Sequence, residues 1–524
     1  MNSNAASPSG SAMTNTADVI IVGCGPVGAI LGLLLEQCGI SSLILERENE
    51  LYPLPRAVHF DDHIMRVFQT LGMAEAVEAV TRYNPGMRFV DPKNNLLLDW
   101  PRPPGVGENG WYSSYRFHQP DLEKILRDKI SASNCVELKT GVAVTNVEQG
   151  SGYAAVQCQS EHGNVAERYQ ARYVVGCDGA NSLVRKSIGQ QVHDFGFNEH
   201  WLVIDAVLKH DKPELGDYTI QHCGRHRPAT YVRCPGLRRR WEIALKPGED
   251  RSGFDDETIL WDLLSDWVTP EEADIERSAV YEFKSQVSEQ WRKDRLFIAG
   301  DAAHLTPPFM GQGMCAGIRD VSNLAWKLAE CCRDETRFLV DRDDERSSKI
   351  NGLLESYQLE RIANVTEYIQ TAIELGELIN SCSRSSHKGG SSQAESVAEQ
   401  ESDSSTVKMK SLAPTLGAGL GVSLNSAVTG HWIQQPRLSC GNLVDDVVGY
   451  KPMLIVEPAL WGLYSDKRTL PFVVLYSEGQ AGLQDCLDVH EVSSVLVRPD
   501  RYILGGARNI NELESLISLA CQYW

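Results

Sequence analysis

Glycines and one carboxylate near the start of the chain have the types and the spacing that suit the binding of a dinucleotide. Gly23, Gly25 and Gly28 form a GxGxxG pattern directly after the apolar run 19–22, and Glu46 ends the next apolar run. In this pattern the first glycine permits a tight turn, the second lets a pyrophosphate approach the backbone, and the third lets a helix pack closely on the strand. Glu46 can bind ribose hydroxyls, which predicts an adenosine ribose without a 2′-phosphate, as in FAD or NAD.

Two later segments also place a carboxylate at the end of an apolar run. The first ends at Asp178, and the second, a predicted strand over 296–299, ends at Asp301. A Pro- and Gly-rich turn over 307–314 then opens a predicted helix over 316–329. A carboxylate at a strand tip, with a helix start aimed back across it, forms a ligand site in an open α/β sheet.

The composition bounds the class of protein. Acidic residues outnumber basic ones, 70 to 50, so the formal net charge is −20, which argues against nucleic acid or an anionic membrane surface as a partner. No apolar run is long enough for a membrane-spanning helix, and the uncharged segment 1–16 lacks the features of a signal peptide. The 14 cysteines show no CxxC spacing, which predicts reduced thiols, a cytoplasmic location and no metal site.

The 524 residues suffice for two or three domains. Strand-like periodicity over 196–283, interrupted by a helix at 257–268, predicts a separate sheet that could form the floor of a substrate pocket. A long helix is predicted over 346–381, followed by a disordered, Ser-rich linker over 382–410. The other predicted units are a disordered tail at 1–16, a discontinuous domain made of 17–195 and 284–345, and a small α/β unit at 411–524.

Several polar residues keep two interpretations open. Arg56 could neutralise a phosphate or a flavin carbonyl, but an arginine at the surface needs no role. His59 lies in an extended segment, where a lone histidine is more often structural than catalytic. The run 238–240 contains three arginines and forms either a hairpin turn or an anion-facing cluster, with the turn favoured for two of the three. Asn511 is expected to cap the last helix.

The three strand-end motifs, in this order, resemble those of the single-component flavin-dependent aromatic hydroxylases, the family related to para-hydroxybenzoate hydroxylase. The resemblance is strongest to the members that hydroxylate 3-(3-hydroxyphenyl)propionate, and it extends to a similar hairpin over 497–502 near the end of the chain. It implies an α/β protein with a Rossmann-like FAD-binding fold, a mixed-sheet substrate domain and a C-terminal thioredoxin-like domain. The lack of CxxC argues against a redox role for that last domain.

The resemblance also implies which residues hold FAD and meet the electron donor, NADPH or NADH. Asp301 would bind the ribityl hydroxyls, and the segment 311–314 would offer backbone N–H groups at a helix start to the flavin pyrimidine edge. A helix N-terminus stabilises negative charge there by about 0.3–2 kcal/mol. The implied cofactor-binding residues are Gly23, Gly25, Gly28, Glu46, Arg47, Arg56, Gln119, Asp178, Gly179, Arg185, Arg240, Asp301, Pro308, Gly311, Gly313 and Met314.

The implied reaction is the hydroxylation of a phenolic or related aromatic substrate with NAD(P)H and O2, through a flavin C4a-hydroperoxide. On the same resemblance, His59 would face the flavin and help to remove the phenol proton, while Tyr231 and Arg233 would lie beside the substrate. The implied partners are a small aromatic molecule and O2, and a homodimer is left open. Two alternatives also remain: an FAD-dependent epoxidase, Baeyer–Villiger-type oxygenase or oxidase on a natural-product intermediate, and a flavoprotein without catalytic function.

Overall fold

The computed structural model describes most of the chain. The described residues are 17–54, 56–160, 163–223, 227–246, 248–249, 251–254, 256–337, 344–387, 414–424, 426–465 and 469–524. The predicted tail at 1–16 and most of the predicted linker at 382–410 lie outside these ranges. Residues 382–387 belong instead to the long helix α8 (Asp344–His387), which is therefore longer than predicted. No helix among the described residues is long and apolar enough to cross a membrane.

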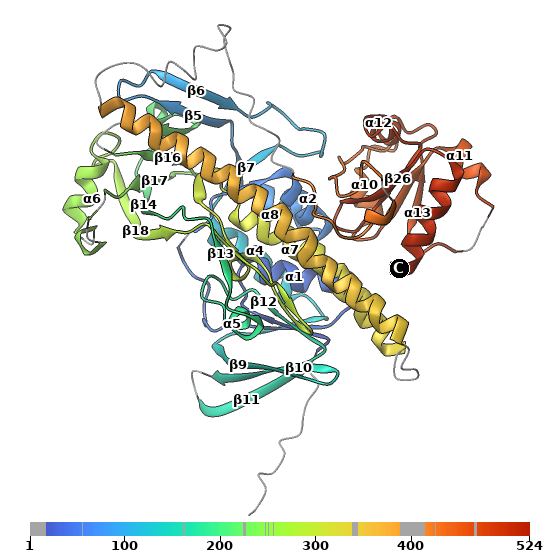
Figure 1. Cartoon of the computed structure of the whole chain (residues 1–524). Helices are drawn as coiled ribbons and strands as arrows, with labels where there is room; N and C mark the ends of the chain where they lie inside the picture. The colour runs from blue at the N-terminus through green and yellow to red at the C-terminus, as the bar shows by residue number, and fades with distance from the viewer. Residues whose placement is uncertain are drawn as a thin grey trace, which may run out of the picture.

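A six-stranded sheet forms the centre of the N-terminal domain (Figure 1). Its strands lie in the order β20-β21-β12-β1-β2-β8, and all neighbours are parallel except β20 and β21. Strands β1 and β2 are buried throughout, as expected for parallel strands whose two faces are both covered. The strands are β20 (Arg292–Lys293), β21 (Leu296–Ile298), β12 (Tyr173–Gly176), β1 (Val19–Val22), β2 (Ser42–Leu45) and β8 (Val136–Lys139).

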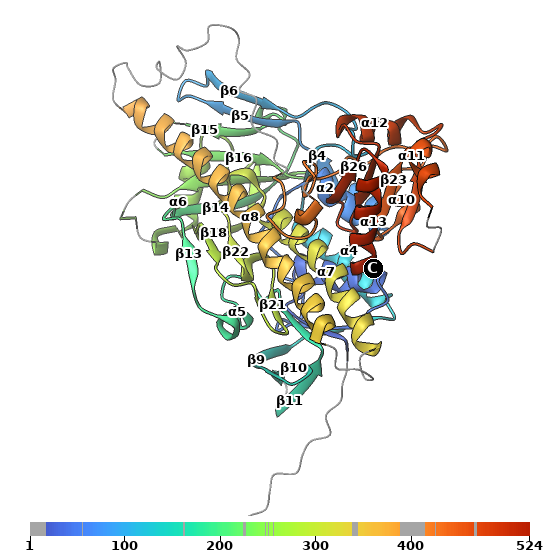
Figure 2. The same cartoon turned by 45° about the vertical axis from the view of Figure 1, so that its right-hand side comes forward.

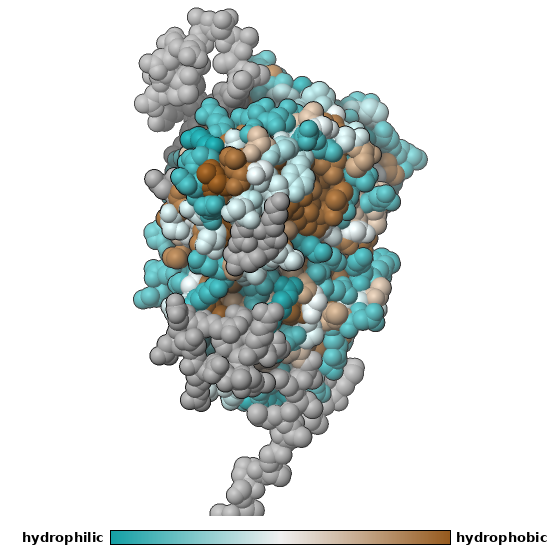
Figure 3. Space-filling model, turned by 90° about the vertical axis from the view of Figure 1, so that its right-hand side faces the viewer, coloured by the Kyte–Doolittle hydropathy of each residue, from teal (hydrophilic) through white to brown (hydrophobic). Residues whose placement is uncertain are grey.

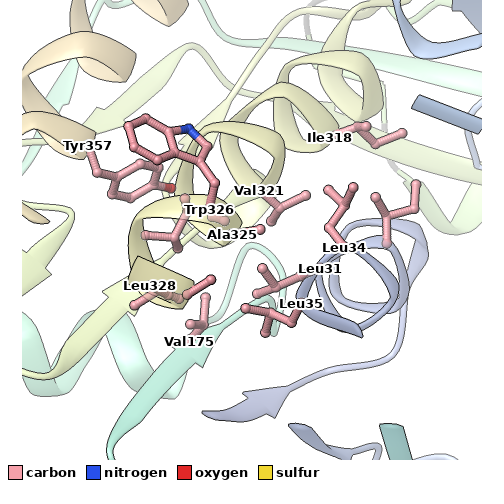
Figure 4. Packing of buried hydrophobic residues seen from close by; sticks show 14 of the residues in the cluster. Leu31, Leu34, Leu35, Val175, Ile318, Val321, Ala325, Trp326, Leu328 and Tyr357 are labelled. Carbon is pink, nitrogen blue, oxygen red and sulfur yellow. The ribbon is translucent and has the colours of Figure 1, made fainter. Parts of the chain in front are cut away.

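Two helices that are far apart in the sequence pack against each other beside this sheet. Helix α1 (Pro26–Gln37) has a proline in its first turn and an apolar body, and α7 (Gly313–Arg337) lies against it. Figure 4 shows Leu31 of α1 and Val321 of α7 within one buried cluster. Burying each such side chain contributes about 1.5–3 kcal/mol. Helix α7 begins three residues before the predicted start at 316 and extends well past 329.

The starts of α1 and α7 approach each other closely because a glycine lies at the contact. A Cβ atom added at Gly317 would lie 2.7 Å from Val27 Cγ2 and 3.0 Å from Gly300 Cα. Gly300 has φ +63°, a left-handed conformation that glycine adopts without strain. The beginning of α1, the beginning of α7 and the corner after β21 are therefore held together at one end of the sheet.

A seven-stranded sheet carries the second part of the domain, in the order β18-β14-β17-β16-β15-β5-β6. The pair β15–β5 is parallel and the other pairs are antiparallel, so the sheet is mixed, as predicted. Strands β5 and β6 come from outside the predicted range 196–283, because a long-range pairing with β15 adds this hairpin. The strands are β18 (Ala273–Phe283), β14 (Glu199–Leu208), β17 (Arg238–Ala244), β16 (Ala229–Arg233), β15 (Thr219–His222), β5 (Gly86–Val90) and β6 (Leu96–Pro101).

Helices and smaller sheets complete the N-terminal part. Helix α6 (Glu257–Leu264) covers one face of the seven-stranded sheet, where Trp241 and Leu264 share a buried cluster. Figures 1 and 2 show α8 running along the molecule, and its later part packs on Phe89 of β5. The small sheets are β3 (His59–Asp61), β7 (Ser114–Phe117) and β4 (Thr81–Tyr83); β9 (Val142–Gly150), β10 (Tyr153–Ser160) and β11 (Gly163–Ala171); and β13 (Val192–Asp194), β19 (Gln286–Ser288) and β22 (His304–Leu305). The remaining α-helices here are α2 (Asp62–Thr70), α3 (Ala74–Ala79), α4 (Gln119–Ser131) and α5 (Leu183–Ile188).

The C-terminal unit contains a four-stranded sheet in the order β24-β23-β25-β26. Strands β23 and β24 are parallel, and the other two pairs are antiparallel. Asn509, rather than the predicted Asn511, caps the last helix by accepting a hydrogen bond from the Glu512 N–H at 3.1 Å. The thioredoxin-like classification of this unit stays a prediction. Its elements are α10 (Val444–Val448), β23 (Met453–Val456), α11 (Pro458–Leu463), β24 (Val473–Tyr476), α12 (Ala481–Val489), β25 (Ser494–Val497), β26 (Ile503–Ala507) and α13 (Ile510–Tyr523).

Buried ion pairs attach the C-terminal unit to α7 and α8. Glu360 of α8 pairs with Lys327 of α7 at 2.7 Å and with Arg498 of the C-terminal hairpin at 2.9 Å. Arg498 also pairs with Asp500 at 2.6 Å, and all four side chains are fully buried. Figure 3 views the molecule from the side of the C-terminal unit and shows apolar patches among mostly hydrophilic residues. The two positive and two negative side chains at the attachment therefore neutralise each other.

Candidate functional site

The carboxyl ends of four neighbouring strands meet at one edge of the central sheet. Strands β2, β1, β12 and β21 are mutually parallel, so the residues that follow them lie side by side. These residues are Glu46 after β2, Gly23 after β1, Asp178 after β12 and Asp301 after β21. In open α/β sheets, ligands bind in the crevice outside such strand ends.

The glycine turn after β1 has the geometry that its sequence predicts. A Cβ added at Gly23 would lie 2.5 Å from the Cys177 carbonyl oxygen, and one at Gly28 would lie 2.1 Å from the Gly23 carbonyl oxygen. A Cβ at Gly25 would meet no atom within 4 Å, although Gly25 is the N-cap of α1. Two of the glycines are therefore required by packing, and the third leaves open space at a helix N-terminus, where a phosphate is favourable.

Glu46 is tied to this turn. Its Oε2 accepts a hydrogen bond from the Cys24 N–H at 2.7 Å, and its Oε1 accepts one from the Glu48 N–H at 3.0 Å. The half-buried carboxylate is thereby oriented beside the turn and keeps lone pairs for further donors, such as ribose hydroxyls. The neighbouring Arg47 is exposed and pairs with Glu48 at 2.9 Å, so nothing directs it into the site.

The two carboxylate oxygens of Asp178 differ in their hydrogen bonding. Asp178 Oδ2 accepts hydrogen bonds from the first N–H groups of α5, at 2.7 Å from Leu183 N and 3.3 Å from Val184 N. Its Oδ1 is buried and has no hydrogen-bond partner among the described residues. Gly179 has φ +75°, and Arg185 joins the corner at Asp178 to the next one by donating to the Ala302 carbonyl oxygen at 2.9 Å. A ligand hydroxyl would satisfy the unpaired oxygen.

Asp301 projects from the corner after β21. Its side chain is exposed, yet the protein around its carboxyl raises its pKa, while His304 and Arg56 lower it. The corner behind Asp301 is fixed by buried Asp320, which accepts from the Gly300 N–H at 3.0 Å and contacts His304 Nε2 at 2.7 Å.

Sequence reasoning missed this supporting network. Arg361 of α8 donates to Asp320 Oδ1 at 2.8 Å, and both side chains are fully buried. The partners His304 and Arg361 lower the pKa of Asp320 against the effect of burial. The preceding residue, buried Arg319, pairs with Asp61. The available signal was the adjacent Arg319-Asp320 pair between the apolar residues Ile318 and Val321, because charged residues at buried helix positions need partners.

The turn before α7 brings a second open helix start to the same site. Pro308–Met310 forms a short 3-10 helix, and Gly311 follows with φ +63°. A Cβ added at Gly313 would meet no atom within 4 Å, and Met314 is half-buried. The N–H groups at the start of this 25-residue helix can therefore meet a group that carries negative charge.

His59 lies next to this turn, and both nitrogens of its ring have hydrogen-bond partners. Its Nδ1 is 3.2 Å from the Gly311 carbonyl oxygen and its Nε2 is 2.8 Å from Ser114 Oγ. Because a carbonyl oxygen only accepts, Nδ1 carries the proton and Nε2 accepts from the serine hydroxyl. Burial, with the charge of Arg116, lowers the pKa of His59 to about 3. The neutral side chain supports the turn, and its role in removing the phenol proton stays a prediction.

Gln119 and Arg240 position the segment that carries Arg56. Gln119 Oε1 accepts from the N–H groups of Arg56 at 3.1 Å and of Ala57 at 2.8 Å. Arg240 donates to the Arg56 carbonyl oxygen at 2.8 Å and pairs with Asp205 at 2.7 Å. The Arg56 side chain itself is exposed and lies over the Tyr52 ring at 4.8 Å. Gln119 and Arg240 are thus placed to act on the site through the backbone of this segment.

Tyr231 and Arg233 lie on the face of the seven-stranded sheet opposite Arg240. Side chains alternate along a strand, and Tyr231 pairs with Trp241 in the buried cluster under α6. Arg233 pairs with Asp217 near the same face. Neither side chain lies on the Arg240 side of the sheet, and their position beside the substrate stays a prediction. The turn predicted for two of Arg238 to Arg240 is wrong, because all three belong to β17.

The fold and the convergent strand ends define a dinucleotide-binding α/β protein. The FAD binding domain family matches residues 16–363, which is more than half of the 524 residues, and the chain belongs to this family. The open Cβ positions at Gly25 and Gly313 and the unpaired Asp178 Oδ1 fit FAD, the cofactor of the family. Among the residues that the structure describes, no group of three or more His, Cys, Asp or Glu could hold a metal ion.

Known proteins similar to this chain are flavin-dependent hydroxylases and monooxygenases. The probable NADH-specific resorcinol 4-hydroxylase of Rhodococcus jostii (strain RHA1) is 34% identical over 522 residues, covering 95% of this chain and 93% of that protein. The 3-(3-hydroxy-phenyl)propionate/3-hydroxycinnamic acid hydroxylase 2 of Burkholderia vietnamiensis (strain G4 / LMG 22486) is 32% identical over 375 residues, covering 71% of this chain and 64% of that protein. The solved structure of the flavin-dependent monooxygenase PieE in complex with FAD and substrate has a TM-score of 0.76 at 18% identity, covering 97% of this chain and 98% of the PieE chain. The predicted family resemblance and the α/β FAD-binding fold are confirmed.

Proposed function

We propose that this chain is an FAD-dependent monooxygenase that uses NAD(P)H and O2 to hydroxylate a small phenolic or related aromatic substrate. The observation that carries the proposal is the meeting of Glu46, Asp178 and Asp301 with the starts of α1 and α7 at one sheet edge. Membership of the FAD binding domain family and the names of the relatives support it. FAD, when bound, supplies the hydride-accepting and oxygen-activating chemistry.

In this proposal the protein residues bind and orient the cofactor. The start of α1 and Glu46 hold the adenosine end, and Asp178 and Asp301 hold hydroxyl groups farther along. The start of α7 stabilises negative charge at the flavin end by about 0.3–2 kcal/mol. His59 keeps the Gly311 carbonyl, and with it the start of α7, in place.

The experiment is NADH and NADPH oxidation by the purified, FAD-loaded protein across a panel of phenols. The expected result is that at least one phenol accelerates oxidation and gives a hydroxylated product without a matching yield of hydrogen peroxide. Oxidation that yields only peroxide with every phenol would favour an oxidase, and oxygen insertion into a ketone or alkene would favour the alternative oxygenases.

A cytoplasmic location and a homodimer are further parts of the proposal. The lack of CxxC spacing among the 14 cysteines supports the location. For the homodimer, the elution volume of the purified protein beside size standards gives the test, and a monomer at micromolar concentration would contradict it.

A further inference from the structure

Arg116 lies on the polar face of the small sheet that supports the start of α7. Strand β7 alternates Ser114 and Arg116 with Tyr115 and Phe117, whose aromatic rings are buried. Arg116 pairs in register with His59 of β3, so both side chains lie on one face. Since His59 contacts the Gly311 carbonyl oxygen, Arg116 is next to the proposed flavin end of the site.

Arg116 also reaches the seven-stranded sheet. Its guanidinium donates a hydrogen bond to the hydroxyl of Thr219, which is a buried residue of β15. Arg116 therefore stands between the turn that begins α7 and the sheet proposed to line the substrate pocket. A substrate held against the flavin end by that sheet would meet this guanidinium.

The fully buried arginines among the described residues have carboxylate partners, but the half-buried Arg116 does not. Arg240 pairs with Asp205 at 2.7 Å, and Arg361 pairs with Asp320 at 2.8 Å. Across the part of the chain that the structure describes, no carboxylate lies within 4.0 Å of Arg116. The nearby carboxylates already serve other arginines, because Glu242 lies 3.8 Å from Arg240 and Asp61 pairs with Arg319.

A second uncompensated arginine adds to the local positive charge. Arg102 is half-buried, lies over the Trp100 ring at 4.3 Å, and has a buried Nε without a hydrogen-bond partner in the described residues. Burial lowers the pKa of Arg116 to about 10, and the charges of Arg102 and Arg240 add to this effect, while Glu242 opposes it. Keeping a charge away from water costs free energy unless an opposite charge or hydrogen bonds replace the water.

We propose that Arg116, assisted by Arg102, binds an oxyanion of the aromatic substrate and so selects anionic aromatic molecules. The planar guanidinium donates paired hydrogen bonds that match a carboxylate, and it also binds a single phenolate oxygen. The oxyanion has two sources, a carboxylate substituent or the ionised phenol itself. The inference rests on the proposed function for the position of the substrate.

The experiment compares ligand binding by the FAD-loaded wild type and Arg116→Met, followed by the change in flavin absorbance. The probes are 3-(3-hydroxyphenyl)propionate and its carboxamide. Each is also tested as the derivative in which the phenol hydroxyl is methylated. If Arg116 binds the carboxylate substituent, Arg116→Met should bind the acid about 10- to 100-fold more weakly than the wild type does. Its affinity for the carboxamide should change less than about threefold. If Arg116 binds the ionised phenol, the substitution should lower the affinity for the acid and for the carboxamide by the same factor. Both methyl ethers should bind the wild type weakly, and the substitution should not change their affinity.

Two further variants make the result interpretable. Arg116→Lys keeps the charge and should recover part of the lost affinity, which a general folding defect would not allow. Arg168→Met removes an arginine of β11 that pairs with Glu148 at 2.8 Å, away from the site, and should bind every probe like the wild type. Equal binding of all probes by wild type and Arg116→Met, at unchanged FAD content, would overturn the inference.

Failure of the inference and failure of the proposed function give different results. Oxygen insertion into a phenol without any dependence of binding on Arg116 contradicts the inference and leaves the monooxygenase proposal standing. Binding of the acid that depends on Arg116, without oxygen insertion into any probe, supports the anion site and contradicts the hydroxylase proposal.

Discussion

The attachment of the C-terminal unit and the strand-end site both concentrate charged residues, but the charges are balanced in only one of them. At the attachment, Glu360 has Lys327 at 2.7 Å and Arg498 at 2.9 Å, all fully buried. At the site, Arg116 has no carboxylate within 4.0 Å among the described residues, and Asp178 Oδ1 has no partner there. Balanced buried charges hold a structure together, whereas unbalanced charges at a site are available to a ligand.

The largest effect on stability is expected at the balanced region. Glu360→Ala removes the common partner of Lys327 and Arg498 and leaves Asp500 as the one buried carboxylate beside these two positive charges. Breaking such a buried pair costs about 3–5 kcal/mol. Chemical denaturation, followed by tryptophan fluorescence, should show a clearly lower midpoint for the variant. A midpoint equal to that of the wild type would mean that the attachment does not depend on these ion pairs.

A pair of glycine substitutions separates packing from ligand binding within one turn. Gly28→Ala places a Cβ 2.1 Å from the Gly23 carbonyl oxygen, and such overpacking costs about 1–3 kcal/mol. Gly25→Ala meets no protein atom within 4 Å, so it should leave stability of the apoprotein nearly unchanged and reduce FAD affinity at least tenfold. Denaturation midpoints and FAD titration of the apoprotein give both quantities. Full FAD affinity in Gly25→Ala would contradict the placement of the pyrophosphate.

His59 should make stability depend on pH. Its pKa is lowered to about 3 in the folded chain, chiefly by burial, whereas an unfolded histidine titrates near 6.5. Below about pH 6.5 the unfolded chain takes up a proton that the folded chain does not, so the free energy of unfolding falls by up to about 1.4 kcal/mol per pH unit until pH 3.

The measurement for His59 is the pH dependence of the denaturation midpoint between pH 6.5 and 4. The variant His59→Gln removes the titrating group, and its curve should be flatter than that of the wild type by the contribution of one proton. Parallel curves for the two proteins would contradict the buried, neutral state of His59.

The smallest effect is expected for a charge pair at the surface. Lys124 and Asp128 of α4 lie 2.7 Å apart, with both side chains about two-thirds exposed (68% and 66%). Lys124→Ala should change the free energy of unfolding by less than about 1 kcal/mol, because water screens exposed pairs. A loss as large as that for Glu360→Ala would show that burial does not separate the two kinds of ion pair.

Local sequence patterns predicted the geometry of the glycine turn, because each pattern acts within one strand–turn–helix unit. Gly23, Gly28 and Glu46 have the packing and contacts that their spacing implies. The sequence did not reveal that Tyr231 faces α6, because either face of an antiparallel sheet can carry the site. His59 could not be recognised as a support for Gly311, which is 252 residues away in the chain.

Long-range pairings account for the other differences between expectation and structure. Strand β5 joins the seven-stranded sheet through β15, and no local pattern encodes this parallel pairing. The network around Asp320 needs Arg361 from another helix. Alternation within Ser114–Phe117 could have indicated a polar face for Arg116, but not what that face contacts.

The most direct test of the central claim is the fate of oxygen in a single reaction. The FAD-loaded protein is supplied with NADH, a phenol that accelerates NADH oxidation, and ¹⁸O-labelled O2, and the product is analysed by mass spectrometry. The account predicts a product with one additional hydroxyl group that carries one labelled oxygen atom. An unlabelled product, or labelled peroxide with unchanged phenol, would contradict it.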